Sequence, residues 1–476
     1  MLGIVNPARA AQRPNVLFIA ADDLRNDLGC YGDRLVKTPN LDRLAKRGVL
    51  FKRAYCQQAV CNPSRASLLT GRRLDTLRVW DLPTHFRTTS PDVVTLPQHF
   101  KQHGYFTQNI GKIYHNWIHS MQGDPASWSV PAQMHFASHG NDKPVIEGAP
   151  PPNLAKDPKC ECREVPDEAY FDGRVAKLAV EALRELKAKA QPFFLAVGFW
   201  KPHSPMNAPK RYWDLYKRED VPMPKNPDWP KDAPRIAWHD SREMLGVKTR
   251  TLTSEAVQEI RHGYLANISY LDAQVGKVLD ELDRLKLADN TVIVFWSDHG
   301  YHLGEQTLWA KTSNFELDAR VPLIIAPPKT KHAGAKTDSL AELMDLYPTL
   351  SDLCGLPKPA GVEGVSLVPV LNNPKATLRS VALTQHSRPA YYDREPSKTP
   401  TTMGYSIRTD RFRYTEWRDW KSGATVAREL YDHSADPDET RNVADNSKFS
   451  KDVEACAHLL QELRPVVQPG WKPLLP

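Results

Sequence analysis

A cysteine precedes a predicted helix in the run Cys61-Asn62-Pro63-Ser64-Arg65-Ala66-Ser67-Leu68-Leu69-Thr70-Gly71-Arg72. Proline is favoured in a first helical turn and glycine commonly follows a helix end, so we expect the helix between Pro63 and Gly71. Cys61 would then lie at the helix N-terminus, where free N–H groups and the helix dipole attract an anion. Arg65, one turn further on, can point at the same place. The alternative is a buried structural cysteine, which is the commoner role of a single cysteine.

Acidic residues and histidines follow three apolar runs that we expect to form buried parallel strands. These are Asp22-Asp23 after Val16–Ala21, Pro202-His203 after Phe193–Trp200, and Asp298-His299 after Thr291–Trp296. In open α/β sheets, ligands bind beyond the carboxyl ends of the strands, so these side chains should share one rim with Cys61. Each motif alone is more often a cap, a turn or a structural histidine. Their coincidence favours a functional site.

The residue types at this rim suit the hydrolysis of an anionic ester. Three carboxylates would offer the oxygen ligands that a hard cation such as calcium prefers, and these are Asp22, Asp23 and Asp298. Lys112 and Lys311 can neutralise charge on the ester oxygens, although an isolated lysine is usually surface charge. His115 and His203 are candidates for acid and base because imidazole titrates near neutrality.

Apolar runs alternate with helical periodicity along most of the chain, which indicates an α/β fold. Further strands are expected at Thr107–Gly111 and Val321–Ala326, and helices are expected near residues 39–48, 175–186 and 257–285. After Leu371 the pattern changes to short strands near residues 381–384, 405–408, 412–415 and 429–431, with a final helix around 459–463. We therefore expect a catalytic domain at residues 13–375 and an α+β subdomain at 376–476 that closes the substrate pocket. Residues 120–168 are predicted to form a long excursion.

Composition limits the classes of function. The chain has 476 residues, of which 25% are charged and 41% hydrophobic, as is ordinary for a globular protein with a large core. The net charge of +7 suits a polyanionic substrate. No block of lysine and arginine predicts nucleic-acid binding, so we expect no nucleic-acid partner. No apolar run is long enough to span a bilayer, so we expect no membrane partner.

The cysteines and the N-terminal segment bear on where the protein works. Seven cysteines fit no zinc template, and their odd number is consistent with one being reserved for chemistry. Cys160 and Cys162 are too close in sequence for an unstrained disulfide. Ala8-Arg9-Ala10 resembles a signal-peptidase site, although no apolar stretch precedes it. We expect a periplasmic or secreted protein, with a cytoplasmic location as the alternative.

The cysteine run is similar to the signature of the sulfatase family, Cys-x-Pro-Ser-Arg with a Thr-Gly-Arg tail. The resemblance extends from about Arg13 almost to the C-terminus through Arg-Pro-Asn-Val at 13–16, Asp-Asp-Leu-Arg at 22–25, Leu-Gly-Cys-Tyr-Gly-Asp at 28–33, Gln-Gln-Ala-Val-Cys at 57–61, Phe-Phe-Leu-Ala-Val-Gly at 193–198, Lys-Pro-His at 201–203, Ser-Tyr-Leu-Asp at 269–272, Ser-Asp-His-Gly at 297–300, Trp-Ala-Lys-x-Ser-Asn-Phe at 309–315 and Met-Gly-Tyr-Ser-Ile-Arg-Thr at 403–409. The last two stretches resemble the iduronate-2-sulfatase branch of the family, which belongs to the alkaline phosphatase superfamily.

The resemblance implies a fold, a modified cysteine and a metal. The fold is a large mixed, mostly parallel sheet sandwiched by helices, with a smaller C-terminal antiparallel sheet. A maturation enzyme would convert Cys61 to formylglycine, whose hydrated aldehyde attacks sulfur. Calcium would be surrounded by Asp22, Asp23, Asp298, His299 and the modified Cys61. Because nitrogen is an unusual calcium ligand, the contact of His299 with the ion is the least expected of these.

The resemblance also implies roles for the basic residues. Arg65 would steady the formylglycine, and Lys112 and Lys311 would bind the sulfate group. His203, together with Lys311, would assist the leaving oxygen. His115 would deprotonate the remaining hydroxyl of the sulfated diol, so that sulfate is eliminated and the aldehyde returns.

The substrate implied is a sulfated glycan with a terminal 2-O-sulfated uronic acid, typically iduronate. Arg388, in Gln385-His386-Ser387-Arg388-Pro389, would pair with the uronate carboxylate, with a plain surface arginine as the alternative. Tyr301-His302 and the excursion at 120–168 differ most from the family pattern and should shape specificity. Two alternative functions remain open: a sulfatase of another sulfated sugar, and a phosphonate or phosphodiester hydrolase of the same superfamily. A non-enzymatic glycan-binding protein is a third reading.

Overall fold

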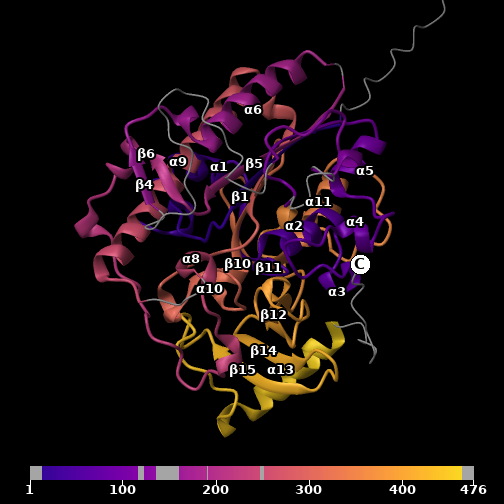
Figure 1. Ribbon diagram of the computed structural model, residues 1–476. Helices are drawn as coiled ribbons and strands as arrows, with labels where there is room; N and C mark the ends of the chain where they lie inside the picture. The colour runs from indigo at the N-terminus through magenta and orange to yellow at the C-terminus, as the bar shows by residue number, and fades with distance from the viewer. Residues whose placement is uncertain (1–12, 116–122, 136–159, 190, 247–250, 464–476) are drawn as a thin grey trace, which may run out of the picture.

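The computed structural model describes residues 13–115, 123–135, 160–189, 191–246 and 251–463 (Figure 1). Ala8-Arg9-Ala10, the middle of the excursion predicted at 120–168 and the end of the predicted C-terminal subdomain lie outside the described residues. The predictions that rest on those segments stay predictions. No helix in the described part of the chain is both long and apolar enough to cross a bilayer.

A seven-stranded mixed sheet forms the centre of the larger part of the molecule. In order across the sheet, its strands are β11 (Lys336–Glu342), β2 (Val49–Tyr55), β10 (Arg320–Ala326), β7 (Thr291–Ser297), β1 (Asn15–Asp22), β5 (Phe193–Pro202) and β3 (Phe106–Gly111). Strand β10 is antiparallel to both neighbours, and all other neighbouring pairs are parallel. The predicted mixed, mostly parallel sheet is confirmed.

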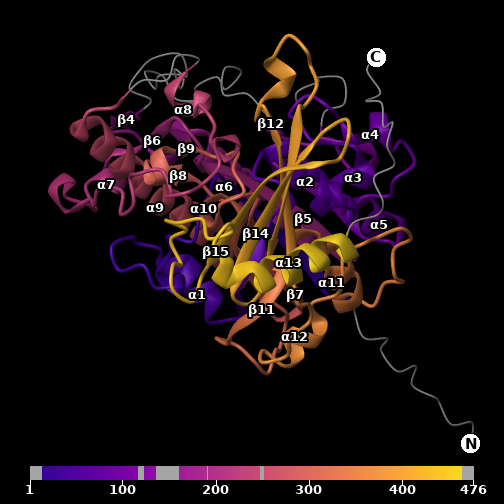
Figure 2. The same cartoon turned by 90° about the horizontal axis from the view of Figure 1, so that it is seen from below.

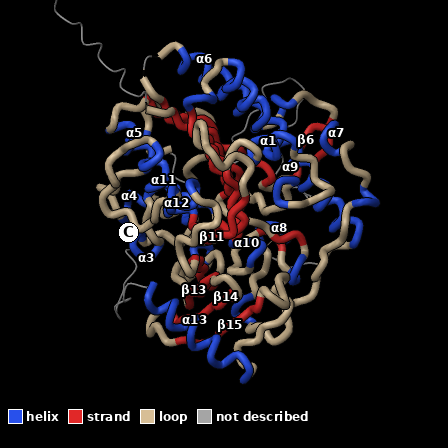
Figure 3. Tube along the Cα trace, turned by 180° about the vertical axis from the view of Figure 1, so that it is seen from behind, coloured by secondary structure: helices blue, strands red, loops and turns tan. Residues whose placement is uncertain are grey.

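Helices cover both faces of this sheet, because both faces of its strands are apolar (Figure 3). In β1, Leu17 and Ile19 pack on one side, while Val16 and Phe18 pack on the other. The first side carries α1 (Pro39–Ala45), α6 (Phe171–Lys187) and α9 (Ser254–Arg284), and the second carries α2 (Cys61–Thr70), α5 (Leu96–Gln102) and α11 (Leu346–Leu353). The parallel strands β7, β1 and β5 therefore bring their carboxyl ends to one rim of a fully buried sheet.

A smaller antiparallel sheet follows in sequence and lies at one end of the molecule (Figures 1 and 2). Its strands are β12 (Ala382–Arg388), β13 (Thr402–Arg408), β14 (Phe412–Asp419) and β15 (Thr425–Asp432), and α13 (Ser450–Leu463) packs on it. This confirms the α+β class expected for the C-terminal region. The boundary between residues 375 and 376 stays a prediction.

Shorter elements connect these layers. They are α3 (Leu74–Leu77), α4 (Phe86–Thr89), β4 (Cys160–Arg163), β6 (Met206–Pro209), α7 (Lys210–Trp213), α8 (Arg242–Leu245), β8 (His302–Leu303), β9 (Trp309–Ala310), α10 (Glu316–Ala319) and α12 (Val368–Asn372). A buried ion pair between Arg413 of β14 and Glu316 of α10 joins the regions of the two sheets, and Arg413 also pairs with Glu439 of its own region at 2.8 Å. All seven cysteines carry free thiols.

Candidate active site

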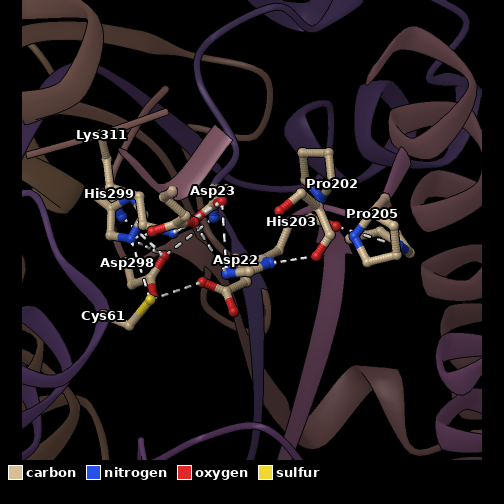
Figure 4. A network of polar contacts seen from close by, with 12 residues as sticks. Asp22, Asp23, Cys61, Pro202, His203, Pro205, Asp298, His299 and Lys311 are labelled. Carbon is tan, nitrogen blue, oxygen red and sulfur yellow. Dashed lines mark hydrogen bonds and ion pairs between the residues drawn. The ribbon is translucent and has the colours of Figure 1, made fainter. Parts of the chain in front are cut away.

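Cys61 is the first residue of α2, at the rim formed by the carboxyl ends of β1, β5 and β7. The predicted helix is confirmed, and Gly71 ends it in the left-handed conformation with φ 65°. Cys61 Sγ lies 3.5 Å from Asp22 Oδ1 and 3.5 Å from His299 Nε2 (Figure 4). Burial, reinforced by the charge of Asp22, raises the pKa of the Cys61 thiol well above its usual range. The side chain is therefore a neutral thiol at an anion-attracting helix end.

Three carboxylates and one imidazole meet beside Cys61. The side chains of Asp22, Asp23, Asp298 and His299 are buried (Figure 4). One ligand atom each of Asp22, Asp298 and His299 lies close to Cys61 Sγ, and Asp23 forms a second close group with Cys61 and His203. Asp23 has the left-handed backbone, with φ 63°, and its carboxylate lies against Lys311 and His299. His299 Nε2 lies 3.3 Å from Asp23 Oδ1 and 3.6 Å from Asp298 Oδ1.

The orientation of His299 leaves its second nitrogen available to a ligand. Its Nδ1 lies 2.9 Å from the carbonyl oxygen of Gly300, which can only accept a hydrogen bond. The proton of the neutral imidazole is therefore on Nδ1, and the lone pair of Nε2 faces the carboxylates.

This donor set fits a divalent cation. Burial, together with the neighbouring Asp22, Glu243 and Asp298, raises the pKa of Asp23 well above its usual range, although Lys311 opposes the shift. Crowded buried carboxylates of this kind repel one another unless a cation lies among them. Oxygen ligands are those that calcium prefers, and Asp22, Cys61, Asp298 and His299 lie close enough together to share one ion.

Arg65 and Lys112 hold the inner side of the site. Arg65 Nε donates to Asp298 Oδ2 at 2.7 Å, and its other nitrogens donate to the backbone carbonyls of Lys112, Ile113 and Ala21. One guanidinium thus ties α2 to the ends of β1, β3 and β7. Lys112, directly after β3, forms an ion pair with Asp22. Burial alone would raise the pKa of Asp22, but Lys112, His203 and Arg65 outweigh it and keep that pKa well below its usual range.

Lys311 and His203 lie on the outer side. Lys311 Nζ is 2.9 Å and 3.1 Å from the two oxygens of Asp23, and 2.6 Å from Glu243 Oε1. His203 Nδ1 donates to the carbonyl of Ser204 at 2.7 Å, so that Nε2 faces the site, 3.9 Å from Asp23 Oδ2 and 3.6 Å from Glu243 Oε1. Burial, with the charge of Lys311, lowers the pKa of His203 to about 3.

His115 and Arg388 are two further predicted site residues, and both are buried. His115 is buried three residues after Lys112, and burial together with the charge of Lys112 keeps its pKa well below the usual range. Arg388 is also buried, but its guanidinium donates to the backbone carbonyls of Ile236, Thr312, Ser387 and Ala237 and lies 4.7 Å from the ring centre of Trp417. These bonds do not support bidentate pairing with a uronate, so that role stays a prediction without structural support.

Glu243 and Tyr391 were not predicted. Glu243 of α8 contacts Lys311 and His203, and its Oε2 accepts a hydrogen bond of 2.7 Å from the Tyr391 hydroxyl. Neither residue follows a strand of the large sheet or belongs to a recognisable motif, so the sequence carries no local signal for them. Tyr301 and His302, predicted to shape specificity, are buried: Tyr301 stacks on Tyr264, and His302 Nδ1 lies 2.6 Å from Asp318.

The chain is similar to known sulfatases. A family model described as Sulfatase matches residues 14–356, and one described as N-sulphoglucosamine sulphohydrolase, C-terminal, matches residues 304–466. The chain is 37% identical to iduronate 2-sulfatase of Mus musculus, over 95% of this chain and 93% of the relative. It is 36% identical to iduronate 2-sulfatase of Homo sapiens, over 91% of this chain and 92% of the relative.

A solved structure shares the fold. The phosphonate monoester hydrolase of Agrobacterium radiobacter is 26% identical and superposes with a TM-score of 0.72, covering 95% of each chain. With the signature cysteine beside the buried carboxylates and a family model that spans most of the sequence, the chain belongs to the sulfatase family of sulfate ester hydrolases.

Proposed function

We propose that this sulfatase removes a 2-O-sulfate from a terminal iduronate of a sulfated glycan. The observation that carries the proposal is the meeting of Cys61, the buried carboxylates and Lys311 in a chain that is 37% identical to an iduronate 2-sulfatase over 95% of its length. Sulfated sugars are the substrate class that the names of these relatives suggest.

The active form would carry formylglycine at position 61 and calcium among Asp22, Asp23, Asp298 and His299. Formylglycine supplies, in its hydrated form, a hydroxyl nucleophile that a buried neutral thiol does not provide. Calcium, when bound, supplies positive charge at the sulfate oxygens and lowers the pKa of a nearby hydroxyl. The lone pair of His299 Nε2 and the crowded carboxylates support this ligand set.

The chain's own residues would bind the ester and move its protons. Lys112 and Lys311 would hold sulfate oxygens, where charge increases in the transition state. Nε2 of His203 faces the site while Nδ1 is held by a carbonyl, so Nε2 is the atom that would give a proton to the leaving oxygen from the protonated ring, the form that Asp22 and Glu243 favour. His115, kept neutral by burial, would accept the proton that accompanies sulfate release. Arg65 would keep α2, and with it residue 61, in place.

The test is sulfate release from two matched disaccharides. One carries 2-O-sulfate on a non-reducing-end iduronate, and the other carries its sulfate on the adjacent hexosamine. Conversion of Cys61 is first confirmed by peptide mass. We expect release from the first disaccharide alone, and none from a Cys61→Ala variant. Release from neither by fully converted protein would overturn the substrate assignment.

A phosphonate monoester hydrolase is the second candidate, because a solved member of that class is 26% identical and shares the fold. Parallel assays with an aryl sulfate and a matched phenyl phosphonate monoester distinguish the two. We expect the sulfate ester to be the better substrate by about 10- to 100-fold, since the chain is 37% and 36% identical to two iduronate 2-sulfatases. A preference for the phosphonate would favour the alternative.

We also propose that the protein depends on a maturation enzyme in its host. Conversion of Cys61 would need a maturation enzyme, so co-expression with a formylglycine-generating enzyme should raise both the converted fraction and the activity in parallel.

We also propose a periplasmic or secreted location, because sulfated glycans are extracellular polymers. Fractionation of the native host tests this, and recovery only with cytoplasmic markers would contradict it.

A further inference from the structure

Among the described residues, Glu243 is the carboxylate on the outer side of Lys311, the lysine proposed to bind sulfate. Glu243 Oε1 is 2.6 Å from Lys311 Nζ. The Glu243 side chain is 19% exposed, whereas the side chains of Lys311 and Asp23 are 1% and 0% exposed. Glu243 therefore lies between the buried cluster and solvent. Its other oxygen accepts the hydrogen bond from Tyr391, which fixes the carboxylate in this position.

Lys311 Nζ lies within hydrogen-bond distance of three carboxylate oxygens, two of Asp23 and one of Glu243. Glu243 is the more exposed of the two carboxylates on Lys311, so an anion that arrives from solvent at Lys311 lies close to Glu243. It must lie against that carboxylate or take its place on the lysine.

The repulsion between Glu243 and a bound anion scales with the anion's charge, because Coulomb energy is proportional to each charge. A sulfate ester carries one negative charge, whereas free sulfate and a phosphate monoester dianion carry two. If Glu243 lowers the affinity of the site for a monoanion by a given factor, it lowers the affinity for a dianion at the same position by about the square of that factor. The repulsion from Glu243 therefore weakens binding of the sulfate ester less than binding of free sulfate or of a phosphate monoester dianion.

We propose that Glu243 is a specificity-determining residue that selects monoanionic sulfate esters over dianions at Lys311. The same repulsion assists departure of the product, which leaves as the sulfate dianion. This inference rests on the proposed function only in taking Lys311 as a sulfate-binding residue. It does not depend on which sugar carries the sulfate.

The experiment measures binding of two small anions of different charge without turnover. Inorganic sulfate is the dianion, and methanesulfonate, whose carbon–sulfur bond is not hydrolysed, is the monoanion. Calorimetric titration at constant ionic strength gives both dissociation constants for calcium-supplied protein with confirmed Cys61 conversion. In Glu243→Gln we expect affinity for methanesulfonate to rise about threefold and affinity for sulfate about tenfold.

Two variants separate charge from structure. Tyr391→Phe removes the hydrogen bond to Glu243 but keeps the carboxylate, so both affinities should stay within twofold of wild type. Glu243→Asp keeps the charge and should likewise retain weak sulfate binding. Equal changes for both anions in Glu243→Gln, no change, or the same pattern in Tyr391→Phe would overturn the inference. If Glu243→Gln changes the two affinities as predicted but the wild-type protein releases no sulfate from iduronate, only the proposed substrate is refuted.

Discussion

The two ring nitrogens of His203 have fixed and different partners, and this determines what the residue can do. Nδ1 donates to the carbonyl of Ser204, so only Nε2 can exchange a proton with a ligand. Nε2 faces Asp23 and Glu243. Burial and the charge of Lys311 favour the neutral ring and lower the pKa of His203 to about 3, although Asp22 and Glu243 favour the protonated ring. Because the proton of the neutral ring is on Nδ1, Nε2 can give a proton to a leaving alkoxide only from the protonated ring.

Replacing His203 should therefore affect substrates according to their leaving group. In His203→Gln we expect kcat/KM for a sugar sulfate to fall by about 10²- to 10⁴-fold, the usual contribution of a general acid. An aryl sulfate, whose phenolate leaves without a proton, should lose less than about tenfold. Steady-state kinetics on both esters measure this. Equal losses on the two substrates would show that His203 binds the sulfate group instead of protonating the leaving oxygen.

At the scale of elements, the strands that carry the chemistry were predictable and some of their neighbours were not. β1, β5 and β7 are apolar on both faces and end in the acidic or imidazole residues of the site, so pattern and function coincide. The centre of β2 contains Lys52 and Arg53, and β11 at the sheet edge exposes alternate polar residues, so neither forms an apolar run. Their pairing is decided by tertiary contacts, which local sequence does not encode.

Close approach between β3 and β5 positions Lys112. The Lys112 amide donates to the Gly198 carbonyl at 2.9 Å, and a Cβ at Gly111 would lie 2.0 Å from that carbonyl oxygen. We expect Gly111→Ala to lower the free energy of unfolding by about 3 kcal/mol, from the left-handed backbone and the overpacking together. It should also lower kcat/KM for the sulfate ester, because Lys112 is displaced. Urea unfolding and steady-state kinetics provide the two measurements.

Gly104 is the matched control for this change. It has a similar positive φ of 87°, against 81° at Gly111, but nothing lies within 4 Å of a Cβ placed there. Gly104→Ala should cost about 1 kcal/mol for backbone strain alone and leave kcat/KM unchanged. If both variants lose the same stability, the contact between the strand ends is not what requires glycine at position 111.

At the scale of the whole molecule, the sequence predicted the carboxylate cluster but not the mouth of the site. Asp22, Asp23 and Asp298 were predictable because the ends of neighbouring parallel strands necessarily meet. Glu243 and Tyr391 come from a four-residue helix and from the segment after β12, and they meet only because the C-terminal region folds back on the larger sheet. Arg388 was expected to reach this mouth and pair with the substrate carboxylate, yet its guanidinium nitrogens donate to backbone carbonyls.

The buried carboxylates also link metal binding to the stability of the whole fold. The raised pKa of Asp23 means that its charged form is disfavoured in the folded protein, so in calcium-free buffer near pH 7 Asp23→Asn should raise the unfolding temperature relative to wild type. With calcium at about 100 times its Kd, wild type should gain about 2.7 kcal/mol, roughly 2–4 °C, whereas the variant gains little. The order of the two melting temperatures should therefore reverse when calcium is added, as differential scanning calorimetry would measure. Equal calcium shifts in both proteins would place the ion away from Asp23, and no shift in either would remove calcium from the proposed mechanism.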